Sequence, residues 1–322
     1  MLRTSSSPRV ATTRARSIAV AAAILVAMLL PGCRGLGAAK PAADLLAGGY
    51  PIYRDKGNGI TAILATPDLG VGTFRFAIAL SDSSGLIRDP AVMMQAYPPG
   101  KTGSLQATAQ EVAADFRAFP DGSRGLYSTS FTFDRAGKWS VVVAVPRPSG
   151  STVLMVLPVT VAQRSSAPAV HEAALASKNR IASDVPSLDR LTTGSAPDPA
   201  LYQHRIADSI AAHRPAVVIF ASPAFCTTPL CGPQVEDASV LAKTYGDRAD
   251  FIHVDLYQNP QEIKGDLSRA VRSPLLKEWG LQTDECTFVI DANGKIAARF
   301  EAYAPPAEVE AALSRVLPRS LR

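Results

Sequence analysis

Larger, mostly apolar residues occupy every second position in several runs of the first half of the chain. The clearest runs cover residues 74–80, 127–133 and 139–145, and the last two flank a turn at residues 134–137. Period-two hydrophobicity predicts antiparallel strands with one buried face. About seven such runs between turn signals predict an all-β sandwich over residues 58–162.

The second half of the chain has a different pattern, in which short continuous apolar runs alternate with helical periodicity. A run of this kind is typical of a strand that is covered on both faces. Asn293-Gly294, between the last two runs, is a strong hairpin signal. The predicted strands are 216–222, 250–257, 286–292 and 295–303, and the predicted helices are 199–213, 233–245, a stretch ending at Gly280, and 306–317. This order predicts an α/β domain over residues 195–322 with a mixed sheet.

Three segments lie outside these two predicted domains. Residues 163–194 are rich in Ala, Ser and Pro without a long periodic run, and we expect a linker there. Residues 1–32 contain arginines followed by an apolar run from Ile18 to Leu30, the pattern of an export signal that is too short to span a bilayer. Residues 33–57 would then form a tether.

The end of the apolar run reads Leu30-Pro31-Gly32-Cys33. Small residues before a cysteine resemble the lipobox of bacterial lipoproteins, although proline is unusual at its position. The resemblance implies that the signal is cut before Cys33, that Cys33 carries lipid, and that the protein is exported and anchored to the cell membrane, facing the extracytoplasmic side. An ordinary secreted chain is the alternative.

The charge balance argues against nucleic acid as a partner. The formal net charge of the chain is +5, but four arginines and no acidic residue lie in the predicted signal. The basic character is therefore largely a property of the targeting peptide. Apart from Cys33 the chain has three cysteines, Cys226, Cys231 and Cys286, so an oxidising compartment would allow one disulfide and one remaining thiol.

Cys226 and Cys231 stand where a predicted strand runs into a predicted helix. The thiolate is the reactive form of cysteine, and a helix N-terminus lowers the thiol pKa. Pro229 and Pro233 both suit the first turn of a helix, which leaves two registers open. In one register Cys226 is the nucleophile and Cys231 resolves the mixed disulfide, and in the other the roles are exchanged. A permanent structural disulfide is the non-catalytic alternative.

The segment from about residue 195 to 320 resembles the thioredoxin superfamily. The residues that carry the likeness are the apolar strand before the cysteines, "CGP" at 231–233 and "TFVIDANGKIAARFE" at 287–301. "GLYSTSFTFDRAGKWSVVVAV" at 125–145 resembles a hairpin of bacterial immunoglobulin-like extracytoplasmic domains. "FASPAFC" at 220–226, "CGP" at 231–233 and "FIHVDLY" at 251–257 resemble a group of uncharacterised bacterial lipoproteins in which an immunoglobulin-like domain precedes a thioredoxin-like domain. The implied fold class is multidomain, an N-terminal all-β immunoglobulin-like sandwich plus a C-terminal α/β thioredoxin-like fold.

The chain departs from the thioredoxin pattern at two places. Gln234 stands where the second cysteine of Cys-Gly-Pro-Cys belongs, and Asp284-Glu285-Cys286-Thr287 lacks the usual proline. The resemblance puts Cys286 close to the cysteine pair. It could be a second resolving thiol, a soft metal ligand or a small core residue, and buried free cysteines are common.

The sequence thus predicts a membrane-anchored protein that performs thiol–disulfide exchange through Cys226 and Cys231, with protein thiols or disulfides as partners and no cofactor. One alternative is a non-catalytic interaction protein with a structural disulfide. A second is a Cu(I)-binding chaperone of the Sco type, which would use Cys226 and Cys231, since thiolates suit Cu(I); the only histidine after the pair is His253. A Q-type peroxiredoxin shares the cysteine spacing, but Pro223 replaces the threonine that such enzymes place near the nucleophile.

Overall fold

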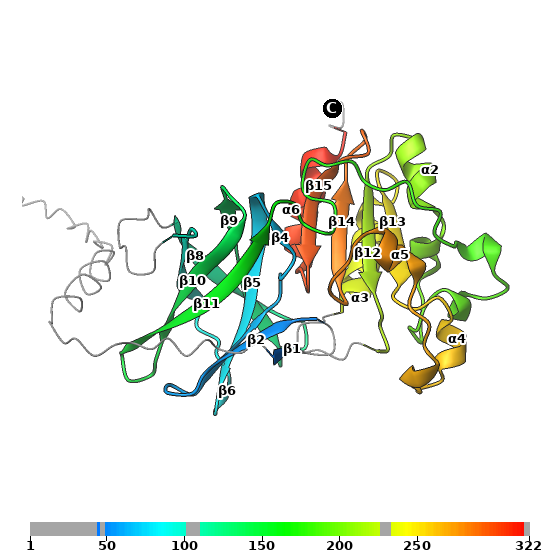
Figure 1. Ribbon diagram of the computed structural model, residues 1–322. Helices are drawn as coiled ribbons and strands as arrows, with labels where there is room; N and C mark the ends of the chain where they lie inside the picture. The colour runs from blue at the N-terminus through cyan, green and yellow to red at the C-terminus, as the bar shows by residue number, and fades with distance from the viewer. Residues whose placement is uncertain (1–43, 46–48, 101–109, 226–232, 319–322) are drawn as a thin grey trace, which may run out of the picture. The chain divides into compact units, whose positions relative to one another are not determined.

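A computed structural model describes residues 44–45, 49–100, 110–225 and 233–318 of the chain. These residues form a large, curled, mixed sheet and a second, smaller sheet that is accompanied by short helices (Figure 1). The first sheet uses the part of the chain before residue 163, and the second uses the part after residue 215. The described part of the chain is therefore mostly β, and its helices lie after residue 181.

The large sheet has eleven strands in the order β1-β2-β3-β5-β9-β8-β7-β10-β11-β4, with β6 paired to β5. All neighbours are antiparallel except β11 and β4. The strands are β1 (Asp44–Leu45), β2 (Pro51–Asp55), β3 (Ile60–Leu64), β4 (Leu69–Gly70), β5 (Gly72–Asp82), β6 (Gly85–Leu86), β7 (Ala91–Tyr97), β8 (Gln110–Ala118), β9 (Gly125–Phe133), β10 (Gly137–Pro146) and β11 (Thr152–Ala162).

The alternation in the sequence explains the core of the large sheet. The alternating apolar positions predicted in β5, β9 and β10 point to one side, where Phe76, Phe131 and Phe133 are fully buried. Phe76 packs edge to face on Phe131 and Phe133 does so on Trp139, with ring centroids 5.4 and 5.0 Å apart. The Tyr53 hydroxyl of β2 donates a hydrogen bond to the Pro158 carbonyl of β11 at 2.8 Å. This bond links strands that are far apart in the sheet order, as expected for a sheet that curls around its apolar face.

The large sheet begins earlier than the sequence pattern predicts. β1 and β2 lie within residues 33–57, the segment expected to be a tether, and β2 pairs with β3 from Ile52–Ile63 to Asp55–Ile60. "PIYRD" is too short and too polar to show a clear period of two. It is a strand because β3 offers a pairing edge, and Gly59, with a φ of +66°, helps to form the turn between them.

The small sheet has the order β13-β12-β14-β15, in which β12 is parallel to β13 and antiparallel to β14. The strands are β12 (Ala216–Ala221), β13 (Asp250–Asp255), β14 (Cys286–Ile290) and β15 (Ile296–Glu301). All residues of β12, β13 and β14 are buried, which agrees with strands covered on both faces. Among the described helices the two longest are α3 (Gln234–Tyr245) and α6 (Pro306–Val316), close to the predicted ranges.

Two predicted helices are broken into shorter pieces. Residues 199–213 contain the 3-10 turn η3 (Pro199–Tyr202) and the helix α2 (Ile206–Ala211). The break has a tertiary cause, because the Asn179 side chain accepts a hydrogen bond from Ile206 N at 2.8 Å and so starts a new helix there. The stretch before Gly280 contains α4 (Pro260–Ile263), η4 (Leu267–Arg269) and α5 (Pro274–Glu278), and the left-handed backbone at Lys264 ends α4.

The segment predicted as a linker is ordered against the small sheet. It contains the 3-10 turns η1 (Ala182–Asp184) and η2 (Leu188–Arg190). Its first part runs along β15, where His171 N donates to Ile296 O at 2.8 Å and Ile296 N donates to Glu172 O at 2.9 Å. Residues 171–174 therefore cover backbone groups of the edge strand that would otherwise be unpaired.

The described parts of both sheets belong to one compact unit. Ala77 and Ala79 of β5 are buried on the outer face of the large sheet, in a cluster with Ala302 and Tyr303. Beside this cluster Arg75 donates to Glu308 of α6 at 3.0 Å and to the carbonyl of Tyr303 at 3.1 Å. Small side chains on β5 thus leave room for the segment after β15.

Candidate functional site

The cysteine pair predicted to carry the chemistry lies in residues 226–232, which are outside the described residues. Cys33 is also outside the described residues. The structure describes both ends of the segment that holds Cys226 and Cys231. Residues 222–225 follow β12, the second strand in the small sheet, and Pro233 precedes α3. The surroundings of these two ends can therefore be examined in detail.

Thr193, from the segment before η3, ties down the residues that follow β12. Its backbone N and its hydroxyl both donate to the Asp255 carboxylate, at 2.7 and 2.9 Å. Because the hydroxyl proton goes to Asp255, its oxygen accepts from Ser222 at 2.9 Å and from Ala224 N at 3.3 Å. Burial raises the pKa of Asp255, and the hydrogen bonds from Thr193 and Tyr257 oppose that rise. The chain is thus held in place two residues before Cys226.

His253 is hydrogen-bonded to the last residue of β12. It is buried, with Nδ1 2.8 Å from the Tyr202 hydroxyl and Nε2 3.1 Å from the Ala221 carbonyl. A carbonyl only accepts, so we assign the proton to Nε2, and Tyr202 then donates to Nδ1. Burial lowers the pKa of His253, which keeps the ring neutral. Both nitrogens are occupied, which leaves no lone pair for a metal of the kind that a Sco-type site would use.

The N-terminus of α3 is anchored to the segment after β15. Gln234 is buried, and its side-chain oxygen accepts from Ala304 N at 2.9 Å. Asp237, in the first turn, accepts from the Tyr303 hydroxyl at 2.8 Å. Burial raises the pKa of Asp237, while this hydrogen bond lowers it. Gln234, which replaces the second cysteine of the thioredoxin pattern, therefore has a structural role as a helix anchor.

Several clefts lie near the ends of the cysteine segment, and two of them differ in charge. The first, of about 330 Å³, is lined by Ser222, Pro223 and Pro233 together with four acidic residues and one cation, Asp121, Glu236, Asp284, Glu285 and Arg124. The second, of about 520 Å³, lies beside β13 and has Lys178, Arg180 and Arg190 on one wall. Phe225, which directly precedes Cys226, packs edge to face on Tyr257 of the second cleft, with ring centroids 6.1 Å apart.

Cys286 is the one predicted site cysteine that the structure describes. It begins β14, is paired with Phe220 of β12 and Glu301 of β15, and is buried as a free thiol. Burial raises the pKa of Cys286 to about 12, and the nearby Arg299 opposes this rise. The group therefore stays a thiol at neutral pH and is a poor nucleophile. These features favour the core-residue alternative for Cys286.

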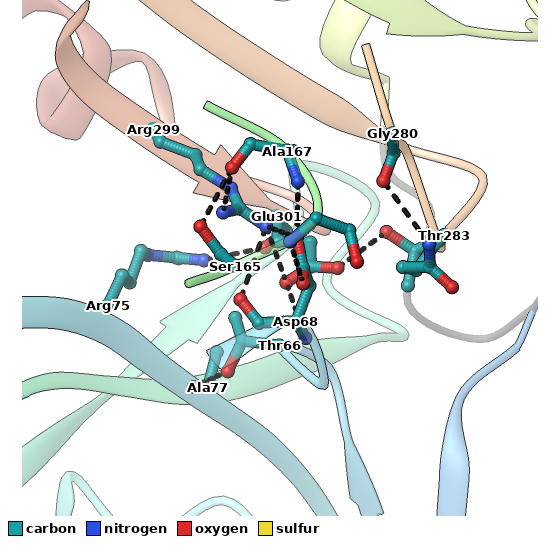
Figure 2. A network of polar contacts seen from close by, with 12 residues as sticks. Thr66, Asp68, Arg75, Ala77, Ser165, Ala167, Gly280, Thr283, Arg299 and Glu301 are labelled. Atoms are coloured by element: carbon teal, nitrogen blue, oxygen red, sulfur yellow. Dashed lines mark hydrogen bonds and ion pairs between the residues drawn. The ribbon is translucent and has the colours of Figure 1, made fainter. Parts of the chain in front are cut away.

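Behind Cys286 lies a buried ionic network that joins the two sheets (Figure 2). Arg299 of β15 donates to Asp68, from the segment between β3 and β4, at 2.7 Å, and its guanidinium is 3.5 Å from Glu301. Asp68 also accepts from Ser166 N at 2.7 Å. Thr283 donates to Glu301 at 3.0 Å. Burial raises the pKa of Glu301 to about 7, although Arg299 favours its charged form.

Sequence reasoning missed most of this supporting machinery. One signal of these buried contacts was present in the sequence, namely polar residues on one face of otherwise apolar strands. They are His253 and Asp255 in "DFIHVD", and Arg299 and Glu301 in "AARFE". A buried polar residue in such a place needs a partner. The partners Thr193, Asp68 and Thr283 carry no comparable mark, because they lie in irregular segments.

Metal and membrane sites were sought over the same described residues. In that part of the chain no group of three or more His, Cys, Asp or Glu side chains is arranged to hold a metal ion. None of the described helices has the length and apolarity needed to cross a bilayer. The apolar run from Ile18 to Leu30 lies outside the described residues.

Comparisons with known proteins give little further information. No protein-family model matches the chain. No curated protein matches it either. Among solved structures, the soluble domain of PmoD from Methylocystis sp. ATCC 49242 (Rockwell) aligns with 37% of this chain and 98% of its own, at 17% identity and a TM-score of 0.22. A likeness at that score supports no conclusion about fold or function.

Proposed function

We propose that this chain is a lipid-anchored, extracytoplasmic thiol–disulfide exchange protein, with a thioredoxin-like domain after an immunoglobulin-like one. The observation that carries the proposal is the position of the cysteine segment. It joins β12, an inner strand of a four-stranded sheet, to the N-terminus of the twelve-residue helix α3. A thiol at such a helix end has a lowered pKa and forms the reactive thiolate more readily.

The order of elements supports the thioredoxin-like assignment. A parallel strand pair linked by α3 is followed by an antiparallel hairpin and α6, as the sequence predicts. For the immunoglobulin-like assignment the support is weaker, because the strands of the first half form one continuous hydrogen-bonded sheet. Its buried aromatic face is compatible with the proposal.

The proposed reaction is a pair of thiolate displacements. One cysteine thiolate attacks a sulfur of the partner disulfide, the partner's S–S bond breaks, and the partner's leaving thiolate takes a proton from water. The second cysteine then attacks the first, forms the Cys226–Cys231 disulfide and releases the other partner thiol. The partner gains two electrons and this chain loses two. α3 begins at Gln234, directly after Pro233, and this start favours the register in which Cys231 takes the first step and Cys226 resolves the mixed disulfide.

The anchored ends of the segment suit this chemistry. Thr193 holds Ala224 on one side, and Ala304 holds Gln234 on the other. Such fixed ends favour a defined geometry for the two thiols, whose Cα atoms must come within about 7 Å to form a disulfide. Cys286 is not needed, because its buried thiol stays protonated.

The reduction potential of the Cys226–Cys231 pair tests the proposal. The full-length chain in detergent is equilibrated in glutathione buffers and its thiols are trapped, with Cys286→Ser measured in parallel. We expect a potential above about −300 mV, in the range of exchangeable disulfides, and the same value in the variant. A bond that resists reduction until the protein unfolds would overturn the proposal in favour of a structural disulfide.

The membrane anchor is tested separately. Cys33→Ser removes the proposed lipidation site, and we expect the protein to move from the membrane fraction to the soluble fraction without losing its redox potential. Mass spectrometry of the N-terminal peptide should show a lipid on Cys33 in the original chain. An unmodified cysteine there would indicate an ordinary secreted protein.

A further inference from the structure

The larger of the two clefts beside the cysteine segment is built from three parts of the chain. Its floor is the C-terminal half of β13, including His253 and Asp255. One wall comes from the segment between the sheets, at residues 178–180 and 190–191. The other wall comes from residues 257–262 and 271–275. The volume is about 520 Å³.

Hydrogen bonds hold these walls in place. The Arg180 guanidinium spans the cleft end, donating to the Gln258 carbonyl at 3.0 Å and to the Arg190 carbonyl at 2.6 Å. On the opposite wall, Asn259 accepts from Val271 N at 2.8 Å and donates to the Arg269 carbonyl at 3.0 Å. The cleft is therefore preformed, so a ligand would not have to order it.

The exposed charges of the cleft are mainly positive. Lys178, Arg180 and Arg190 are all exposed, and Glu262 is the opposing exposed acid in the lining. The other acid, Asp255, is buried and already accepts from Thr193 and from Tyr257 N. An incoming ligand therefore meets three cations on one wall, beside apolar surface from Leu191, Val271 and Leu275.

The cleft also touches the cysteine segment. The Tyr257 ring lies between the aromatic ring of Phe225 and the guanidinium of Arg272, which is 5.7 Å from the ring centroid. Phe225 is the residue before Cys226. A ligand in the cleft would thus lie beside Tyr257 and close to Phe225, where the described chain leads into the cysteine segment.

We propose that this cleft docks a short, extended, acidic segment of the polypeptide whose thiols or disulfide are exchanged, with Lys178 and Arg190 pairing with its carboxylates. That the ligand is an exchange substrate rests on the proposed function, but the binding itself does not. An extended peptide fits best because the preformed cleft combines three exposed cations with apolar surface from Leu191, Val271 and Leu275. A bare anionic surface would use the cations alone.

Fluorescence anisotropy with two labelled decapeptides tests the proposal, one of alternating Glu and Ala and one of alternating Lys and Ala. The protein is the full-length chain in detergent at 150 mM salt. We expect the acidic peptide to bind, and Lys178→Glu/Arg190→Glu to weaken its binding by about tenfold. Lys243→Glu, an exposed reversal on α3 outside the cleft, should leave binding unchanged.

Reduction of oxidised glutathione is measured on the same proteins to separate the two proposals. Exchange activity without a preference for the acidic peptide would overturn the docking proposal and leave the proposed function standing. Peptide binding that depends on the cleft, without exchange activity, would overturn the proposed function and leave the docking proposal standing. Anionic phosphatidylglycerol vesicles are the second probe. If the original chain binds the vesicles but not the acidic peptide, and the double variant loses vesicle binding, then the cations serve to bind a membrane surface. That result would overturn the proposal that the cleft docks a peptide.

Discussion

The Arg299 guanidinium and the Asp68 carboxylate form a 2.7 Å ion pair that joins the small sheet to the large one, although 231 positions separate them in the sequence. Both side chains are 6% exposed. Asp68 is further held by Ser166 N and Ala167 N, and Arg299 lies 3.5 Å from Glu301. The contact between the two sheets therefore contains a buried ionic centre (Figure 2).

Removing one member of this pair should strongly destabilise the protein. We expect Arg299→Met to lower the free energy of unfolding by about 3 kcal/mol, because it leaves the Asp68 carboxylate buried without its cation. Asp68→Asn combined with Arg299→Met should cost less than the two single changes added together. Urea unfolding measures all three. Arg135→Met is the control, since its pair with Asp134 is 60% and 56% exposed and should contribute less than about 1 kcal/mol.

Glu301 should make stability depend on pH near neutrality. Its pKa in the folded protein is raised to about 7 by burial, against an ordinary value of 4.5. The folded state therefore binds the proton more tightly than the unfolded state, and the stability contributed by this group falls as the pH rises from 4.5 through 7. Arg299, Asp68 and Thr283 are the groups that face it.

We expect Glu301→Gln to gain stability relative to the original chain by roughly 2 kcal/mol between pH 5 and pH 8. Urea unfolding at four pH values across this range measures the difference. Glu310→Gln on α6 is the control, because Glu310 is only partly buried and lies outside the network. A difference between Glu301→Gln and the original chain that does not change with pH would contradict the prediction.

The Cys286 thiol should be nearly unreactive in the folded protein. Its pKa is raised to about 12 by burial, so very little thiolate exists at pH 8, and the side chain is out of contact with solvent. We expect iodoacetamide to label Cys286 at least about 100-fold more slowly in the native protein than in urea. Peptide mapping by mass spectrometry, in a Cys226→Ser/Cys231→Ser background, gives the rate. Rapid native labelling would bring Cys286 back as a candidate resolving thiol.

The Thr193 hydroxyl should fix the residues that lead into Cys226. Thr193→Val removes the hydroxyl that accepts from Ser222 and Ala224 and donates to Asp255, and we expect a loss of about 2 kcal/mol in the free energy of unfolding. Hydrogen exchange at the Ala224 amide should become faster at the same time. Thr193→Ser keeps the hydroxyl and should restore slow exchange. Fast exchange in both variants would mean that the threonine methyl group, and not its hydroxyl, is important.

The regular elements of this protein follow closely from the sequence. The strand pattern at 127–133 and 139–145 corresponds to β9 and β10, and α3 begins one residue after the predicted start. These predictions succeed because local periodicity reports which face of an element is buried. The helix predicted over 199–213 fails as one element because Asn179, outside the predicted range, caps α2 at Ile206.

The candidate site, too, could be predicted only in part from the sequence. Cys226 and Cys231 were found from composition and spacing, and their segment lies outside the described residues, so their role stays a prediction. The groups that surround the segment were not predictable, because each is defined by a partner that is distant in the chain. Thr193 is 62 positions from Asp255, and Tyr202 is 51 positions from His253.

The alternating β pattern of the first half, the strand and helix order of the second half and the location of the cysteines can all be read from the amino-acid sequence. Local hydrophobic periodicity and residue type are sufficient for these features. The folded chain alone reveals that Arg299 pairs with Asp68, that Thr193 holds the end of β12, and that three cations gather beside β13. Such contacts depend on which segments are buried against each other, and burial is what makes an ion pair or a hydrogen bond necessary at those positions.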